Sequence, residues 1–417
     1  MTTFYVAKSG NDSNSGRDQG APKLTIAGAI TVADVSPGGH TIEIIDSGQY
    51  DEANLEVTFP GLTITHTASS LARPQIYDST GAESWIFRWN TNVTGNTLQG
   101  LELGPCKGGV LFSTSAQTQR TFHLTGCFVH GVPKLVTHAI EGNGVDDPCT
   151  IHESVIYGTG PGTDANALIL VNGSLYIRNS LVTSSKDSPG YLLKNYAGAN
   201  VTASFSTFIN RDTASTYPVI QASKVINCIV SGSPGTDGIA SNDHSYNLVH
   251  VGGPSFKNLD NSATNATGSG DITGRPPEFV AGTVQGETNA IAANYKLQST
   301  SPAINYGTPY LLTAIDISGN SRPTAGGAGG SLDNPDMGCF EYPTPYWGDY
   351  GTENYPHFAS DFTVNLYLNT TADYKLRYAD SPGQVPFFLG PKGPISLRKD
   401  KAYLVTEGDP SVMTGSG

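Results

Sequence analysis

Leu124-Thr125-Gly126-Cys127-Phe128-Val129 is one copy of a short phrase that recurs along the chain. Residues 151–156, 177–182 and 225–230 are clear further copies, and three weaker ones bring the total to seven. When the fourth residue of each copy is aligned, the spacings are 26, 27, 26, 27, 21 and 19 residues. The aligned column consists of Leu101, Cys127, Ser154, Ser180, Thr207, Cys228 and Asn247.

A period of this length indicates one supersecondary unit stacked many times, because a single unit cannot bury its apolar face without a neighbour. Each phrase is short, rich in β-branched residues and bounded by turn-forming residues, which is typical of a strand between two turns. Helical repeats would need two longer apolar-periodic segments per period, and leucine-rich repeats would show leucines at fixed offsets. The sequence has neither, so it predicts coils of two or three short strands stacked as a parallel β-helix.

Composition narrows the possible functions. The chain has 417 residues, of which 14% are charged, with 49 Gly and 26 Pro. A formal net charge of −13 argues against nucleic-acid binding, which needs clustered basic surface. No run of about 18 apolar residues occurs, so we expect no membrane insertion. The first residues show no export signal, so we expect synthesis in a bacterial cytoplasm.

The five cysteines form neither a disulfide framework nor a zinc-binding pattern, judged by number and spacing. Cys127 and Cys228 share the column of the repeat, where a small, weakly polar side chain packs well. We therefore expect reduced, structural cysteines.

The chain is expected to have three parts. Residues 1–40 would form an N-terminal strand and a short helix that caps the solenoid, and residues 41–343 would form the β-helix. Within it, residues 254–290 lose the apolar pattern and indicate a loop excursion. Residues 344–417 would form a small antiparallel β domain and a tail, because short alternating strands follow Pro343-Thr344-Pro345.

Two stretches resemble a known superfamily. Residues 5–12, the helix beginning near Thr25 and the phrase Gly48-Gln49-Tyr50 resemble the opening of right-handed parallel β-helix proteins of the pectate-lyase-like superfamily. Ser301-Pro302-Ala303-Ile304-Asn305, with residues 316–323 and 336–342, is similar to the closing segment of many such domains. The resemblance implies the fold of roughly residues 4–343. It leaves the activity open, since the superfamily includes lyases, hydrolases, epimerases and phage spikes.

Asp146-Asp147 is the catalytic candidate that the sequence offers. The pair resembles the adjacent aspartates of polygalacturonase-like hydrolases, although their downstream Arg-x-Lys is missing and Pro148 follows directly. Hydrolysis needs two carboxylates about 5–10 Å apart, one with a raised pKa. Aspartates in turns are also common for conformational reasons, so a structural role is the alternative.

Two further groups are candidates for binding. Trp85, Phe87 and Trp89 alternate on one expected strand and share a face. Trp85 and Trp89 could stack on sugar rings, and the alternative is a place in the core or in a subunit contact. Basic residues of the C-terminal part could dock an acidic partner, with a solvated face as the alternative. They are Lys375, Arg377, Lys392, Arg398, Lys399 and Lys401. No histidine spacing indicates a metal site, and no cofactor is expected.

These features favour a bacteriophage virion surface protein, because a β-helix without an export signal can leave its host in a particle released by lysis. We expect a tailspike, fibre or head-decoration protein on the virion surface. It would be a homotrimer, with other virion proteins as partners and host surface polysaccharide as a ligand. Catalytic activity stays open. The alternatives are a polysaccharide depolymerase (glycoside hydrolase or lyase) and a non-enzymatic glycan-binding module.

Overall fold

The computed structural model describes most of the chain up to Tyr342 and, beyond it, the backbone of five strands. The described residues are 1–35, 38–66, 72–79, 85–89, 95–106, 110–114, 121–132, 134–136, 149–158, 167–171, 173–184, 190–195, 199–211, 217–260, 263–280, 294–298, 300–322, 334–342, 362–365, 374–379, 387–388, 394–397 and 402–407. The chain forms two compact units. One comprises Met1–Ala325 and Ser331–Tyr342, the other Gly326–Gly330 and Pro343–Gly417.

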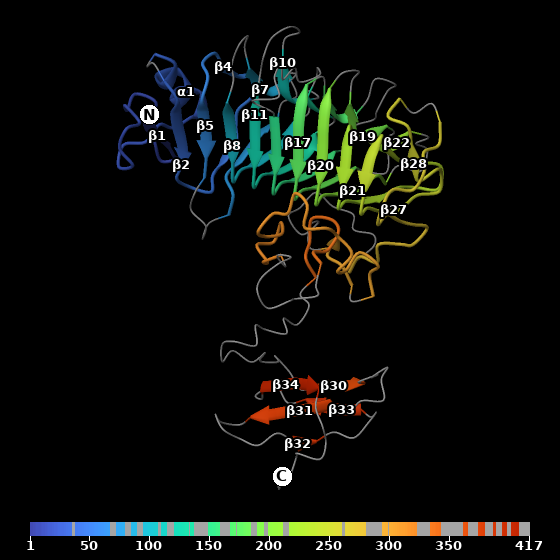
Figure 1. The fold of residues 1–417 in the computed structure, drawn as a ribbon. Coiled ribbons are helices and arrows are strands. Elements are labelled where there is room, and N and C mark those ends of the chain that lie inside the picture. The colour runs from blue at the N-terminus through green and yellow to red at the C-terminus, as the bar shows by residue number, and fades with distance from the viewer. Residues whose placement is uncertain are drawn as a thin grey trace. The chain divides into compact units, whose positions relative to one another are not determined.

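Two long parallel sheets form two sides of the first unit (Figure 1). Sheet A has the order β1 (Thr2–Val6), β2 (His40–Ile44), β5 (Leu62–Thr65), β8 (Asn96–Gln99), β11 (Phe122–Thr125), β14 (Cys149–His152), β17 (Ser174–Arg178), β20 (Asn200–Ser204), β23 (Lys224–Ile226) and β26 (Asp243–Ser245). Sheet B has the order β3 (Gln49–Asp51), β6 (Gln75–Asp78), β9 (Glu102–Cys106), β12 (Phe128–Val132), β15 (Val155–Gly158), β18 (Leu181–Ser184), β21 (Thr207–Ile209), β24 (Ile229–Ser231), β27 (Leu248–His250) and β29 (Ile272–Thr273).

Two shorter parallel sheets form the third side. Sheet C contains β4 (Leu55–Val57), β7 (Trp85–Trp89), β10 (Val110–Thr114) and β13 (Lys134–Val136). Sheet D contains β16 (Ala167–Val171), β19 (Tyr191–Asn195), β22 (Pro218–Gln221), β25 (Asp237–Ala240) and β28 (Phe256–Lys257). The chain passes from sheet A to B and then to C or D, so β2 to β28 make nine three-stranded coils. The predicted parallel β-helix is confirmed, with three strands per coil.

The corner between sheets A and B explains the repeated phrase. Each corner from β8 to β27 has two residues, and the first has a positive φ. Glycine fits this left-handed conformation without steric cost, whereas a side chain there is strained. These first corner residues are Gly100, Gly126, Glu153, Asn179, Phe205, Asn227 and Tyr246.

The second corner residues form a hydrogen-bonded ladder in the interior. The backbone N–H of Cys127 donates to Ser154 Oγ, that of Ser154 to Ser180 Oγ, and that of Ser180 to Ser206 Oγ, each at 3.2 Å. The sequence alignment placed Thr207 in this column, and that was wrong by one residue. Leu181 pairs with Thr207, so Ser206 follows Ser180 in the ladder.

Apolar residues stacked at equivalent positions of successive coils form the core. In sheet A, consecutive strand pairs place one aliphatic or aromatic residue above the next, and each is buried. This column is Phe4, Ile42, Ile64, Leu98, Leu124, Ile151, Ile177, Ala203 and Val225. All five cysteines are also buried and unpaired, as expected.

The N-terminal end of the core is covered by the helix α1 (Ile26–Asp34), close to where apolar spacing predicted it. Thr25 caps it, since its side chain accepts a hydrogen bond from the Gly28 N–H at 2.9 Å. The carboxylate of Glu52 accepts two more of the first free N–H groups, at 3.0 and 2.9 Å. One face of α1 packs into the main core.

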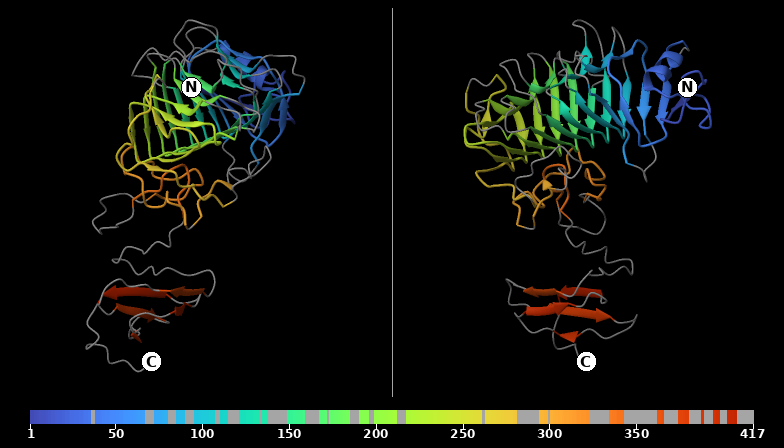
Figure 2. Two further views of the ribbon diagram at one scale, coloured as in Figure 1. Left: turned by 90° about the vertical axis from the view of Figure 1, so that its right-hand side faces the viewer. Right: turned by 180° about the vertical axis from the view of Figure 1, so that it is seen from behind.

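The described residues between positions 275 and 342, here called the closing segment, cover the outer face of sheet B from β12 to β27 (Figure 2). Phe128, Leu181 and Leu248 point outward from sheet B and contact a second apolar cluster that includes Met337 and Phe340. The predicted excursion at 254–290 is only partly a loop. Its described residues include β28 and β29, which continue sheets D and B.

The second unit contains antiparallel strands. β30 (Phe362–Asn365) pairs with β33 (Pro394–Leu397), and β31 (Tyr374–Ala379) pairs with β32 (Phe387–Phe388) and β34 (Ala402–Glu407). Over the part of the chain that the structure describes, no helix is long and apolar enough to cross a membrane.

Candidate functional site

The outer face of sheet A carries a row of polar side chains, most of them partly exposed. Figure 1 looks onto this face, and no described segment crosses it. Alternate residues of each strand point outward, so two outward columns run along the stack. The first is Thr41, Thr63, Thr97, His123, Thr150, Tyr176, Thr202, Lys224 and Asp243, and the second is Glu43, Thr65, Gln99, Thr125, His152, Arg178, Ser204, Ile226 and Ser245. We call this surface the sheet A face.

The centre of the sheet A face carries its most varied chemistry. His123 Nδ1 lies 2.9 Å from Thr150 Oγ1 on the next strand. Tyr176 follows Thr150 in the same column, and Arg178 follows His152 in the other. All five are half-buried, so their backbones are fixed by the ladder while their polar ends reach solvent. Burial lowers the pKa of His152 and nearby Arg178 lowers it further, while the carboxylate of Glu153 raises it.

The closing segment borders the sheet A face along the corner with sheet B. Asn227 Nδ2 donates to the carbonyl of Thr308 at 2.8 Å, and Asn179 Nδ2 donates to the carbonyl of Ile315 at 3.0 Å. Both asparagines occupy the first corner position. The intervening residues therefore run beside the face from β23 to β17.

An exposed tyrosine lies on this border. Tyr310 is 53% exposed, and Lys224 Nζ lies 4.9 Å from the centre of its ring. The same Nζ forms an ion pair with Asp243 at 3.0 Å. The C-terminal end of the sheet A face thus offers an aromatic ring beside a neutralised charge pair.

The outer face of sheet B is different at its two ends. From β12 onward it is apolar and covered, but over β3 to β9 its first outward column is Gln49, Gln75 and Glu102. At the boundary, Glu102 Oε1 lies 3.0 Å from His130 Nε2. The His130 ring stacks on Phe128, with ring centres 4.8 Å apart. A carboxylate and an imidazole in this contact can exchange a proton with a bound molecule, so the pair is an acid–base candidate.

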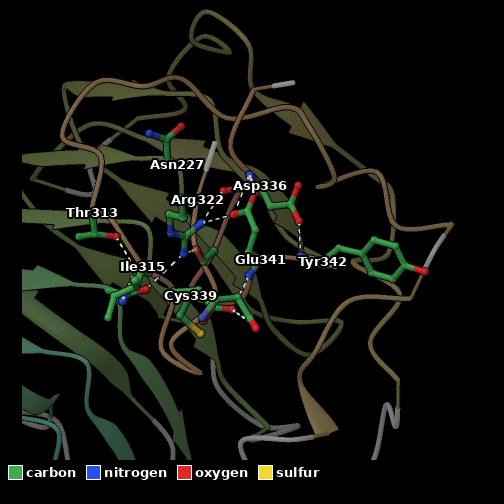
Figure 3. Close-up of polar contacts among 12 residues, drawn as sticks. Asn227, Thr313, Ile315, Arg322, Asp336, Cys339, Glu341 and Tyr342 are labelled. Carbon is green, nitrogen blue, oxygen red and sulfur yellow. Dashed lines mark hydrogen bonds and ion pairs between the residues drawn. The ribbon is translucent and has the colours of Figure 1, made fainter. Parts of the chain in front are cut away.

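Charged residues of the closing segment form a buried cluster, here called the latch, against the solenoid (Figure 3). Arg322 Nη1 donates to Glu341 Oε2 at 2.7 Å, and Nη2 donates to Asn179 Oδ1 at 3.2 Å and to the Gly338 carbonyl at 2.9 Å. The guanidinium also lies over the ring of Phe205, 4.7 Å from its centre. This latch joins the closing segment to two corner residues of the solenoid.

Burial is the main cause of the raised pKa values of the two latch carboxyl groups, Asp336 and Glu341. It raises the pKa of Asp336 to about 6, and the pKa of Glu341 to about 8, where Asp336 contributes further. Arg322 lowers both values without cancelling the effect. Asp316 uses both oxygens on neighbouring N–H groups, including that of Glu341 at 2.9 Å. Because these groups are buried and bond to one another and to the backbone, they hold the fold together and offer no surface to a ligand.

Of the three aromatic residues that alternate on β7, Phe87 and Trp89 lie in the core and Trp85 is half-buried. Trp89 is 3% exposed and stacks on Phe122 with ring centres 5.4 Å apart, and Phe87 is fully buried. Trp89 therefore cannot present its ring to a sugar in this structure. It occupies a place in the core, which was the alternative to sugar stacking. Trp85 is half-buried and donates through Nε1 to Asn54 Oδ1 at 2.8 Å, with Arg88 over its ring.

The remaining predicted site residues are only partly placed. Asp146 and Asp147 lie outside the described residues, as do Lys392, Arg398, Lys399 and Lys401. Lys375 and Arg377 lie two residues apart on β31. Within the described ranges, no group of three or more His, Cys, Asp or Glu residues is arranged to hold a metal ion.

Sequence reasoning missed the sheet A face and the Glu102–His130 pair. The repeat contained the signal, because His152 and Arg178 are the second residues of two copies and His123 directly precedes a third. Reading those positions as one outward surface would have placed them side by side. Glu102 and His130 lie 28 residues apart, and only the stacking of coils joins them.

Comparisons with known proteins found similarity among solved structures alone. No protein-family model and no curated protein sequence matches the chain. Among solved structures, pectate lyase Pel9A matches with 15% identity and a TM-score of 0.45, over 82% of this chain and 96% of that one. A GH136 lacto-N-biosidase from Eubacterium ramulus matches with 8% identity and a TM-score of 0.37, over 65% and 68%. A rhamnogalacturonan lyase matches with 11% identity and a TM-score of 0.29, over 60% and 69%. The order and parallel pairing of its own strands make this chain an all-β protein of the parallel β-helix class.

Proposed function

We propose that this chain is a glycan-binding β-helix that holds an extended polysaccharide along the sheet A face. One observation carries the proposal: an open row of hydroxyl, imidazole, phenol and guanidinium groups lies on rigid, adjacent strands. These groups recur at the strand spacing of about 4.8 Å. A polymer of sugar rings, which repeats its own hydroxyl groups, can therefore bind several rungs at once, with affinity added at each.

Affinity electrophoresis through gels that contain bacterial capsular polysaccharides tests this proposal. The wild-type chain is expected to be retarded by at least one polymer, and Tyr176→Ala to weaken that retardation several-fold. Tyr77→Ala is the matched control, because Tyr77 is a half-buried tyrosine on the outer face of sheet B. Equal losses in both variants, or no retardation by any polymer, would contradict the proposed function.

The setting that we propose is the surface of a bacteriophage particle, as a homotrimeric tailspike, fibre or head-decoration protein. Five buried, unpaired thiols suit a chain that folds in a reducing compartment. Continuous backbone ladders leave few sites for local opening, which suits a particle exposed to the environment. Immunogold microscopy of phage particles and light scattering of the purified chain test this setting. A monomer at micromolar concentration together with unlabelled particles would rule it out.

A second candidate function is depolymerisation of host surface polysaccharide, which the Glu102–His130 contact favours. Glu102→Gln would then abolish the release of new sugar ends while leaving polymer binding intact. The Asp146→Asn, Asp147→Asn double variant tests the other carboxylate candidates in the same assay. If the wild-type chain releases no sugar ends from a polymer that it binds, the glycan-binding function stands without catalysis.

A further inference from the structure

The outer face of sheet B changes from polar to apolar between β9 and β12. On the polar side, Gln49 is exposed and Gln75 and Glu102 are half-buried, so all three reach solvent. The next residue of the same column, Phe128, is 1% exposed and belongs to the apolar cluster of the closing segment. A molecule that lies along the polar side is therefore blocked one strand beyond Glu102.

The Glu102–His130 pair lies at this blocked end. The side chain of Glu102 is 24% exposed and that of His130 is 8% exposed. The pairing of β12 with β15 shifts between Val129 and Val132, and Gly131 within the shift has a positive φ. Such bulges re-aim a side chain and are common beside active sites. The bulge thus places the His130 imidazole against a carboxylate that solvent can reach.

The polar side of sheet B favours an uncharged ligand. At the outward positions of β3, β6 and β9, the charged side chains are Asp51 and Glu102, both carboxylates, which repel an anionic polymer. Gln49 Nε2 donates to Gln75 Oε1 at 3.1 Å, and Gln75 Nε2 donates to the Gly104 carbonyl at 2.8 Å. A carboxamide has two N–H donors and an oxygen with two lone pairs, so both retain capacity for sugar hydroxyls.

Cleavage inside a chain would require room for sugar rings on both sides of the pair. Toward β3, two strand spacings provide about 10 Å of polar surface. In the opposite direction, Phe128 occupies the position next to Glu102. A glycan can therefore reach the pair by its end.

From this geometry we infer that Glu102 and His130 hydrolyse the terminal glycosidic bond of an uncharged glycan. Its end lies toward Phe128 and its remaining rings lie over the two glutamines. The inference rests on the second candidate function, depolymerisation. The proton between Glu102 Oε1 and His130 Nε2 passes to the glycosidic oxygen as the bond from that oxygen to the anomeric carbon breaks. A water molecule adds to this carbon and returns a proton to the pair, so each cycle consumes one water and releases one terminal unit.

Product sizes over time test the inference. The substrates are linear gluco-, galacto- and manno-oligosaccharides, and cyclodextrins as uncharged glucans without an end. Wild-type chain is expected to release one small product of fixed size from at least one linear series, from the earliest time point, and nothing from cyclodextrins. Glu102→Gln should lower the rate at least about a hundredfold. Glu56→Gln is the matched control and should keep the rate, because Glu56 is an exposed carboxylate on β4 of sheet C.

A mixture of fragment sizes at early times, or cleavage of cyclodextrins, would overturn the inference and leave depolymerisation intact. Release from alginate or hyaluronan but from no uncharged glycan would do the same, as would a product with an unsaturated end, which marks elimination. An unchanged rate in Glu102→Gln would remove the pair from catalysis. If no glycan is cleaved but polysaccharide gels still retard the chain, the inference and the second candidate function both fail, and glycan binding on the sheet A face stands.

Discussion

Single residues at the corner between sheets A and B determine how the coils stack. Each serine in the second corner position accepts a hydrogen bond from the backbone N–H of the coil before it, and its own hydroxyl donates to the carbonyl two residues earlier. Ser180 shows both contacts, at 3.2 Å from the Ser154 N–H and 2.9 Å to the Arg178 carbonyl. Cys228 donates in the same way to the Ile226 carbonyl, at 3.3 Å.

Ser180→Ala is expected to lower the free energy of unfolding by about 1–3 kcal/mol, because it leaves the buried Ser154 N–H without an acceptor. Ser180→Cys should cost less, since cysteine occupies the same column at Cys127 and Cys228. Equilibrium unfolding in urea measures both. Equal losses for the two substitutions would show that the missing hydrogen bond is not the cause.

Glycine substitutions at the first corner position distinguish the effect of backbone conformation on stability from the effect of side-chain contacts. Glu153→Gly should leave stability unchanged or raise it by up to about 1 kcal/mol, because glycine adopts the left-handed conformation freely. Its contact with His152 is partly exposed and contributes little. Asn179→Gly should instead lower stability by about 1–3 kcal/mol, since it loses the hydrogen bonds to Ile315 and Arg322. Urea unfolding of the pair decides, and a stabilising Asn179→Gly would contradict this account.

At the scale of elements, the closing segment and its latch make the docking of one segment depend on pH. Asp336 and Glu341 have folded-state pKa values of about 6 and about 8, above their ordinary values of 3.8 and 4.5. A carboxyl group whose pKa is raised by folding stabilises the folded state below its unfolded pKa. That stabilisation is lost as the pH rises through the folded pKa.

Docking of the closing segment should therefore weaken between about pH 4 and pH 8. Hydrogen exchange of residues 300–342 at pH 5 and pH 8 measures this, with faster exchange than the intrinsic pH effect expected at pH 8. Glu341→Gln should reduce the pH dependence, because its side chain cannot ionise. If the difference between the two pH values were unchanged in that variant, another group would control the docking.

Elements also show where reading the sequence succeeded and where it failed. The A–B corner could be read because its two flanking strands are joined by only two residues, so the phrase survives intact in each coil. The strands of sheets C and D follow loops of varying length, and their positions could not be read as a period. The sequence alignment placed Thr207 instead of Ser206 in the ladder column for a related reason. Ala203 occupies the core position of that coil, and alanine marks an apolar position less clearly than leucine or isoleucine does.

At the scale of the whole molecule, the β-helix has a core of its own. Its apolar columns, α1 and the closing segment all lie in the unit that ends at Tyr342. The second unit has separate antiparallel sheets. In the proposed assembly, this second unit provides trimer closure or particle attachment.

A chain that ends at Tyr342 is expected to keep its cooperative thermal unfolding, with a melting temperature within about 2 °C of that of the β-helix in the full chain, since it retains every residue of the two apolar clusters. It should run as a monomer, whereas the full chain should run as three copies of 43.8 kDa. Calorimetry and light scattering test the two statements. A truncated chain that still forms trimers would move the subunit contact to the β-helix itself.

The sequence by itself determined the class of this protein, because a parallel β-helix is specified by a local pattern. Short apolar strands, a corner residue with a positive φ and a small side chain in the ladder recur from coil to coil, so the same local pattern specifies each coil. Only the tertiary structure decided which polar residues meet. Glu102 joins His130, Arg178 lies beside His152, and Arg322 reaches Asn179 across 143 positions. Stacking and back-folding of the chain create these contacts, and no local spacing in the sequence encodes them.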